Sequence, residues 1–358
     1  MRYLIAIMCS VIFLGQMSQT TFAQSNTPLN WQILGDVSAK YEHTELKPAS
    51  FVLGDVDFWF QKQINPQWAA MGEIMLMEMG ASGEPMYHFH PMRLFIEYQQ
   101  SEKFKLRIGQ MHTPIGYYNQ LYPHGGKFFE PTIHRPHLAR VTTGTEILSY
   151  HTVGLNARGT INLNKSWDFQ YIVGIGNGDP HAGIDKNSFK SPYFQLGLQP
   201  LDIDGLSFNT SLYLNEIKDP ADTTNYDLRE IVGTLGVLYE AYPVDLLAEF
   251  FVIGHGESFS SIIDQTSLNG QIPFTSLIGG YLQSSYSINE QALFIQVEAY
   301  QRDKEDLWID GHTDHEKHFG VHWGHRYLIN QGLVLKTGHA YDWANNLHRF
   351  DMQLAYRL

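Results

Sequence analysis

The chain of 358 residues contains a single cysteine, Cys9, which lies in a short apolar stretch near its start. A disulfide scaffold, a thiolate metal site and a cysteine nucleophile are therefore excluded for the rest of the chain. Beyond that first stretch, the sequence has no apolar run of 18 residues and no long helical pattern. Transmembrane helices are not expected either.

Basic residues are also scarce, with 24 Lys and Arg against 37 Asp and Glu and a formal net charge of −13. Nucleic acid is not an expected partner, because binding to phosphates needs a basic face. No linker, composition shift or low-complexity tract divides the chain, so we expect one domain over residues 24–358. No compact catalytic signature is present, and we expect neither an enzyme nor a cofactor.

Residues 1–23 have the order of a secretory signal peptide. Arg2 supplies the positive charge, residues 3–15 form the apolar core, and Thr21-Phe22-Ala23 forms the cleavage site. The apolar core is too short to span a membrane. It also continues past Cys9, which disfavours a lipoprotein. We expect cleavage before Gln24 and export of the remaining chain.

The exported part alternates apolar and polar residues over many short segments, which is typical of β-strands. Sixteen strands are predicted, over residues 30–43, 50–63, 67–79, 87–99, 103–112, 146–163, 166–178, 190–201, 205–217, 226–241, 243–255, 273–288, 291–302, 315–328, 331–344 and 347–358.

The connections between these strands fall into two classes. Tight polar turns such as Asn164-Lys165-Ser166 follow every even strand, whereas most of the other connections are longer. This segregation predicts a transmembrane antiparallel β-barrel with short periplasmic turns and long extracellular loops. Sixteen strands enclose an interior too wide for side chains to fill, so we expect the apolar face of each strand to meet lipid and the polar face to meet water.

One connection, residues 113–146, is far longer than the usual two to six residues. It begins with Thr113-Pro114-Ile115-Gly116 and is rich in aromatic residues, His and Arg. We interpret it as the third extracellular loop, folded into the lumen so that it constricts the pore.

The segment MRLFIEYQQSEKFKLRIGQMHTPIGY, residues 92–117, resembles the strand–turn–strand and Thr-Pro-Xaa-Gly signature of outer-membrane porins of the phosphate-selective porin O/P type. The ending GLVLKTGHAY…RFDMQLAYRL resembles their closing hairpin. The resemblance implies a sixteen-stranded barrel, often a homotrimer, with the third loop in the lumen. This chain departs from the family by ending in Leu358 and by lacking the lysine array that carries phosphate. We therefore adopt the porin assignment without phosphate selectivity.

Alternation also predicts which charged residues face the lumen, where rings of side chains set ion preference. The acidic set is Asp36, Asp55, Asp57, Glu73, Glu97, Asp168, Glu249 and Glu298, and the basic set is Arg93, Lys105, Arg107, Arg158, Arg326, Lys336 and Arg357. We predict that the constriction and pore lining are formed by Arg93, Glu97, Arg107, Lys127, Glu130, Arg135, Arg140, Glu146 and Arg158. The alternative is that the wall charges pair with one another, or that the wall arginines only tether the loop.

Histidine is abundant, with 17 residues gathered in loops, including His134 and His137 in the long connection. Imidazole is the commonest metal ligand, and thioethers such as Met86 and Met92 suit copper(I). His88, His90, His315, His318 and His322 are the candidate metal ligands.

The residues together predict passive diffusion of small hydrophilic solutes or ions through a charged, loop-constricted pore in the outer membrane of a Gram-negative bacterium. Lipid and lipopolysaccharide would surround the barrel. The alternative is a barrel that captures copper or zinc with its His- and Met-rich loops.

Overall fold

The computed structural model describes residues 28–42, 50–78, 87–122, 128–139, 147–178, 189–218, 227–259, 274–304, 306, 308 and 316–358. Within these residues, the strands are β1 (Asn30–Glu42), β2 (Ser50–Gln63), β3 (Trp68–Glu78), β4 (Tyr87–Ser101), β5 (Phe104–His112), β6 (His151–Asn162), β7 (Trp167–Gly176), β8 (Ser191–Pro200), β9 (Leu206–Ile217), β10 (Leu228–Ala241), β11 (Val244–Glu257), β12 (Thr275–Ile288), β13 (Gln291–Arg302), β14 (Lys317–Asn330), β15 (Leu333–Asp342) and β16 (Leu347–Arg357).

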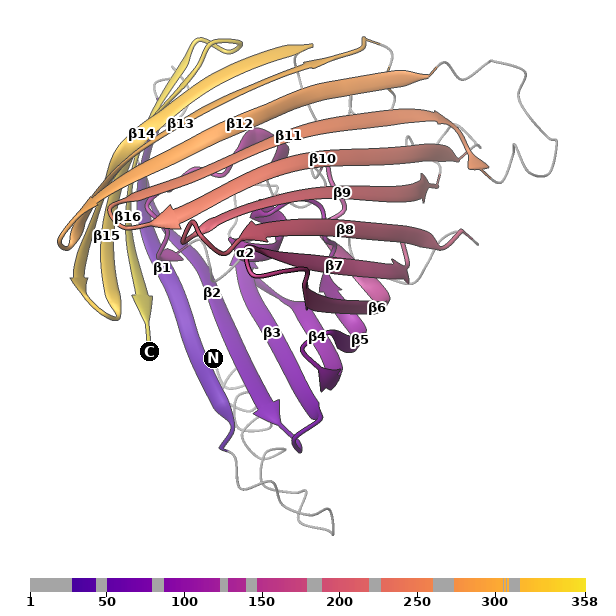
Figure 1. The fold of residues 1–358 in the computed structure, drawn as a ribbon. Helices are drawn as coiled ribbons and strands as arrows, with labels where there is room; N and C mark the ends of the chain where they lie inside the picture. The colour runs from indigo at the N-terminus through magenta and orange to yellow at the C-terminus, as the bar shows by residue number, and fades with distance from the viewer. Residues whose placement is uncertain are drawn as a thin grey trace.

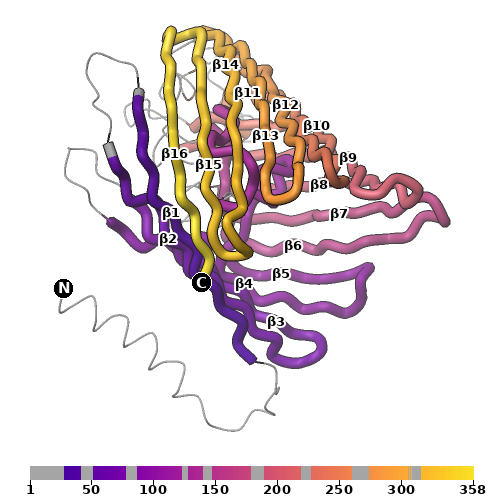
Figure 2. Tube along the Cα trace, turned by 90° about the vertical axis from the view of Figure 1, so that its left-hand side faces the viewer, coloured from indigo at the N-terminus to yellow at the C-terminus, as the bar shows by residue number. Residues whose placement is uncertain are grey.

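The strands form one closed antiparallel barrel in which each strand pairs with its neighbours in sequence. β1 pairs with β16 and closes the wall, for example through Val37 opposite Leu354. Figure 1 shows the strands following one another around the wall, and Figure 2 shows β16 beside β1 after a 90° turn. The predicted sixteen-stranded antiparallel barrel is confirmed.

A soluble barrel has a polar outer face and an apolar inner face, and the wall of this barrel has the reverse. On β13, Leu293 is 58% and Ile295 50% exposed, whereas Gln296 is 0% and Glu298 3% exposed. Because the barrel is closed, the covered face of each strand is the inner one. Apolar side chains therefore cover the outside, and polar and charged side chains face the interior, as alternation predicts for a barrel in lipid.

The tight turns are held by side chains suited to them. Asn65 Oδ1 accepts a hydrogen bond from Gln67 N at 2.9 Å, and Asn164 Oδ1 accepts one from Ser166 N at 2.8 Å. Asparagine is favoured in turns because its side chain bonds the backbone two residues further on. Within the part of the chain that the structure describes, no helix is long and apolar enough to cross a membrane.

Only one predicted strand differs substantially from its observed bounds. Residues 146–163 were expected to form one strand, but β6 begins at His151, and Glu146 lies outside the described residues. Tyr150 O accepts hydrogen bonds from Thr113 N at 2.8 Å and from Asn119 Nδ2 at 3.1 Å. These bonds attach residues 147–150 to the start of the β5–β6 connection, so the wall strand begins only after them.

Candidate functional site: the β5–β6 connection and the inner wall

The β5–β6 connection begins with a sharp turn at Gly116, whose φ of 70° lies in the left-handed region that favours glycine. The turn presents the next two backbone N–H groups to Glu249 on β11, which accepts from Tyr117 N at 2.5 Å and from Tyr118 N at 3.0 Å. Tyr281 on β12 donates its hydroxyl to the same carboxylate. A side chain at position 116 would collide with Oε1 of Glu249. Glycine therefore allows this close contact between the connection and a buried carboxylate.

The short helix α2 (Tyr118–Leu121) lies beside the inner face of β8 to β10. Gln120 Nε2 donates to Gln195 Oε1 at 2.8 Å, and the Tyr117 hydroxyl bonds the Ser207 hydroxyl at 2.9 Å. Burial raises the pKa of Tyr117 to about 12, so its phenol stays protonated and able to donate. These bonds attach Gln120 of α2, and Tyr117 directly before it, to the wall.

The middle of the connection is attached to β14 and β15, which lie about 200 residues later in the sequence. Lys336 Nζ on β15 donates to the carbonyl of Thr132 at 3.0 Å, and Arg326 on β14 donates to the carbonyl of Phe129 at 2.9 Å. Backbone carbonyls buried in this way need donors from elsewhere in the protein. The wall cations supply those donors.

Glu130 is the most perturbed carboxyl group of the described connection. Burial raises its pKa to about 7, while Lys336, Arg135 and the Tyr118 hydroxyl act in the opposite direction. The hydroxyl of Tyr118 lies 3.3 Å from Glu130 Oε1. Glu130 therefore interacts with the anchoring groups of the connection and is only 7% exposed.

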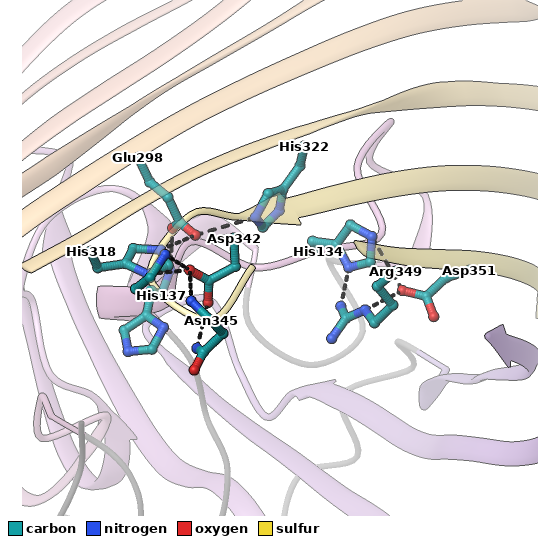
Figure 3. A network of polar contacts seen from close by, with 10 residues as sticks. His134, His137, Glu298, His318, His322, Asp342, Asn345, Arg349 and Asp351 are labelled. Atoms are coloured by element: carbon teal, nitrogen blue, oxygen red, sulfur yellow. Dashed lines mark hydrogen bonds and ion pairs between the residues drawn. The ribbon is translucent and has the colours of Figure 1, made fainter. Parts of the chain in front are cut away.

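A second carboxylate, Glu298 on β13, holds the end of the connection in a histidine cluster (Figure 3). The backbone N–H of His137, in the 3-10 turn η2 (His137–Ala139), donates to Glu298 Oε2. Its other oxygen lies 3.1 Å from His318 Nε2 and 3.3 Å from His322 Nε2. One carboxylate thus binds two histidines of β14 and the backbone of the connection.

His134 makes a neighbouring contact with β16 (Figure 3). Its Nε2 lies 3.2 Å from Asp351 Oδ2, and Arg349 bonds its Nδ1. Arg349 Nε also donates to Asp351 at 2.8 Å. The imidazole of His134 and the ring of His322 stand edge to face with centroids 5.0 Å apart, which joins the contacts on β14 and β16.

Three of the four predicted pore residues on β4 to β6 are paired with a charge of opposite sign. Glu73 on β3 accepts from Arg93, and Glu97 accepts from Arg107. Arg158 makes no hydrogen bond or ion pair with the described residues, although it lies in the electrostatic field of Arg107 and Glu97. Pairing of the wall charges, the alternative left open by the sequence, therefore holds for Arg93, Glu97 and Arg107.

The predicted loop residues are only partly described. Glu130 and Arg135 lie close enough to interact electrostatically. Lys127, Arg140 and Glu146, the other residues expected at the constriction, lie outside the described residues.

The predicted metal ligands are dispersed. His88 and His90 share one face of β4 with ring centroids 6.2 Å apart, and His318 and His322 on β14 contact Glu298 on β13. His315 lies outside the described residues. Over the parts of the chain that the structure describes, no group of three or more His, Cys, Asp or Glu side chains is arranged to hold a metal ion. The metal-capture alternative gains no support from this arrangement.

Sequence reasoning placed Glu249, Glu298 and Lys336 on the inner face, among the charges expected to set ion preference, and did not predict that they attach the connection. In the structure they are the main attachments of the connection. Period-2 alternation could reveal their face, but nothing local in the sequence indicates that their partners lie in residues 117–137.

No protein-family model and no curated protein sequence matches the chain. Among solved structures, the outer membrane channel DcaP of Acinetobacter baumannii is 10% identical to this chain with a TM-score of 0.60. The match covers 95% of this chain and 100% of the DcaP chain. OmpF of Salmonella typhi, in a complex with daunomycin, is 12% identical to this chain with a TM-score of 0.63, and the match covers 92% of this chain and 97% of the OmpF chain. The trimer form of OmpT, an outer membrane protein of Vibrio cholerae, is 9% identical to this chain with a TM-score of 0.58, and the match covers 92% of this chain and 99% of the OmpT chain. At such identities the likeness establishes the barrel fold.

Proposed function

We propose that this protein is an outer-membrane porin through which small hydrophilic solutes or ions diffuse passively. One observation carries the proposal: a long connection is fastened to inward-facing side chains on β11 and on β13 to β16, across a barrel with an apolar exterior. A segment that touches so many inner faces at once narrows the lumen and leaves the wall closed. Such a barrel needs no bond-making chemistry to transport solutes.

The attachments explain why the connection would stay inside the barrel. A segment in the lumen must satisfy its own buried backbone groups, because irregular backbone has no ladder to pair with. Glu249 and Glu298 accept from its N–H groups, and Lys336 and Arg326 donate to its carbonyls. The wall charges therefore tether the constriction, while the residues facing the remaining opening set its preference among solutes.

The proposed setting is the outer membrane of a Gram-negative bacterium, with residues 1–23 removed during export. The likeness to outer-membrane structures and the exposed apolar wall both support this location. Lipid and lipopolysaccharide would contact that wall. A homotrimer is the assembly we propose, since one similar structure is a trimer form.

The test is single-channel recording of the purified, folded protein in planar bilayers. We expect stable conductance steps, and their absence from folded protein would refute the channel. Deleting residues 125–142 should enlarge the steps while the barrel keeps its heat-resistant mobility on gels. A deletion of similar length between Glu257 and Thr275, in the β11–β12 connection, controls for the loss of loop residues as such. Equal conductance of the 125–142 deletion and the unmodified protein would mean that this connection does not constrict the pore.

A further inference from the structure

A small cavity of about 130 Å³ lies between α2 and the inner wall formed by β5 to β9. Its wall side includes Lys105, Arg158, Gln195 and Asn209, and its α2 side includes Gln120 and the neighbouring Tyr117. The register brings the wall residues together: Lys105 pairs with Arg158, and Gly197, two residues after Gln195, pairs with Asn209. The cavity is several times larger than the space one water molecule requires.

Arg158 brings a positive charge to this cavity, and the carboxylate among the lining residues, Glu102, is already paired with Lys105. Arg158 makes no hydrogen bond or ion pair with any described residue, while the cations beside it are already paired. Lys105 Nζ lies 2.8 Å from Glu102 Oε2, and Arg107 bonds Glu97. A guanidinium that borders a cavity without a carboxylate partner favours an anion there, because buried charges are normally paired.

Asn209 offers a second unused polar group. It is only 7% exposed, and neither atom of its amide has a hydrogen-bond partner within the described structure. Buried side-chain amides are nearly always satisfied. The amide atoms of Asn209 are covered in this structure, so the side chain would turn toward the cavity to bond a polar ligand.

The remaining cavity residues are held in place by bonds of their own. Gln195 Oε1 accepts from Gln120, and Gln195 Nε2 lies 3.3 Å from the Ser211 hydroxyl. The Tyr117 ring is fixed by its hydroxyl contact with Ser207. The cavity is thus bounded by fixed groups, and Arg158, together with Asn209 once its side chain turns toward the cavity, can bond a ligand.

We propose that this cavity is a solute-binding subsite for short monocarboxylates, with Arg158 binding the carboxylate and Asn209 binding a neighbouring hydroxyl group. A planar carboxylate matches the forked donors of a guanidinium and accepts two parallel hydrogen bonds from it. A lining cation that has no partner among the described residues matches a monoanion better than a doubly charged phosphate or sulfate. The hydroxyl of a short 2-hydroxy acid can accept from and donate to the amide of Asn209. The subsite rests on the proposed porin function, which gives solutes access to the inner wall.

The experiment measures binding and transport separately. Titration calorimetry on the folded protein in detergent, with sodium lactate as the probe, reports occupancy whether or not the barrel conducts. Bilayer recordings then measure how lactate reduces the chloride current. Lactamide lacks the charge, propionate lacks the hydroxyl, and inorganic phosphate and sulfate test doubly charged anions.

We expect lactate to bind more tightly than propionate and lactamide to bind undetectably. Arg158→Gln should raise the dissociation constant for lactate about tenfold or more, as expected for loss of a charge-assisted pair. Arg158→Lys should restore part of the affinity, since it keeps the charge and loses the fork. Asn209→Ala should weaken lactate about threefold and leave propionate unchanged. It also serves as a second variant if the arginine variants fold poorly.

Arg302→Gln, which removes the same charge from the far end of β13, is the matched control and should leave lactate binding unchanged. Equal affinity for lactate and lactamide, tighter binding of phosphate or sulfate, or unchanged lactate binding by folded Arg158→Gln would each overturn the subsite. A protein that binds lactate as expected but never conducts would refute the channel and leave the subsite standing. A conducting protein that does not bind lactate would refute the subsite and leave the channel standing.

Discussion

Replacing Glu249 with alanine should release the beginning of the β5–β6 connection while the barrel stays closed. The carboxylate accepts hydrogen bonds from Tyr117 N, Tyr118 N and the Tyr281 hydroxyl, and it is only 3% exposed. The pairing of β11 with β10 and β12 is made by backbone groups and does not depend on this side chain. The substitution therefore removes an anchor and keeps the wall.

The magnitude follows from the two backbone N–H groups of the connection that lose their acceptor, because Tyr281 belongs to the wall and loses its acceptor in both the attached and the released state. A buried donor left unpaired costs about 1–3 kcal/mol, so the attached state should lose about 3 kcal/mol. Since about 1.4 kcal/mol is a factor of ten, the ratio of attached to released connection should fall about a hundredfold. A state that is rarely populated in the unmodified protein should then contribute visibly to the current.

Single-channel recording is the appropriate assay, because release of the connection changes the open cross-section. We expect Glu249→Ala to show larger or fluctuating steps, and Glu249→Gln, which keeps one acceptor oxygen, to lie between it and the unmodified protein. Asp245→Ala is the matched control, since Asp245 lies on the same strand and accepts from Ser285 of β12 at 3.0 Å. Currents of folded Glu249→Ala that match those of the unmodified protein would refute the anchoring role.

The remaining predictions concern the rest of the connection. Burial holds the pKa of Glu130 at about 7, above its ordinary value of 4.5, so between these pH values the folded protein binds more protons than the unfolded chain. The contribution of Glu130 to anchoring is therefore complete below about pH 4.5 and declines as the pH rises to about 7. The noise of the single-channel current should increase over that pH range. Glu130→Gln should remove the increase. Noise that rises equally in both proteins would contradict this role. Glu298→Ala should free the backbone of His137 and speed proteolysis of residues 128–139, whereas Asp245→Ala should not; equal protection in both variants would contradict that anchor.

Fifteen of the sixteen strands lie within a few residues of the ranges predicted from alternation, and the reason is local. Inward and outward side chains alternate along any strand, and lipid outside with polar groups inside imposes that pattern on every strand, as on β13. Tight turns carry their own chemistry in residues such as Asn65 and Asn164. Because each strand pairs with its neighbour in sequence, these local signals also specified the barrel.

The candidate site could be predicted only in part. The sequence indicated equally well that Arg93, Arg107 and Arg158 face inward. The first two are paired with glutamates, and the third has no such partner in the part of the chain that the structure describes. Period-2 alternation indicates which face of the wall a side chain lies on, but it does not indicate which residue the side chain pairs with. The difference between a paired and an available arginine, which decides where an anion can bind, follows from distances between neighbouring strands.

The sequence by itself determined the strands, their order and the polarity of the two faces, because period-2 alternation and turn chemistry act over a few residues. Only the tertiary structure decided what holds the long connection, since Tyr118 and Glu249 are separated by 131 residues and Arg349 and His134 by 215. Such partners meet only once the wall has closed, because closure fixes which inner faces lie opposite one another. The cavity beside Arg158 and Asn209 likewise exists only after α2 has been fastened to that wall.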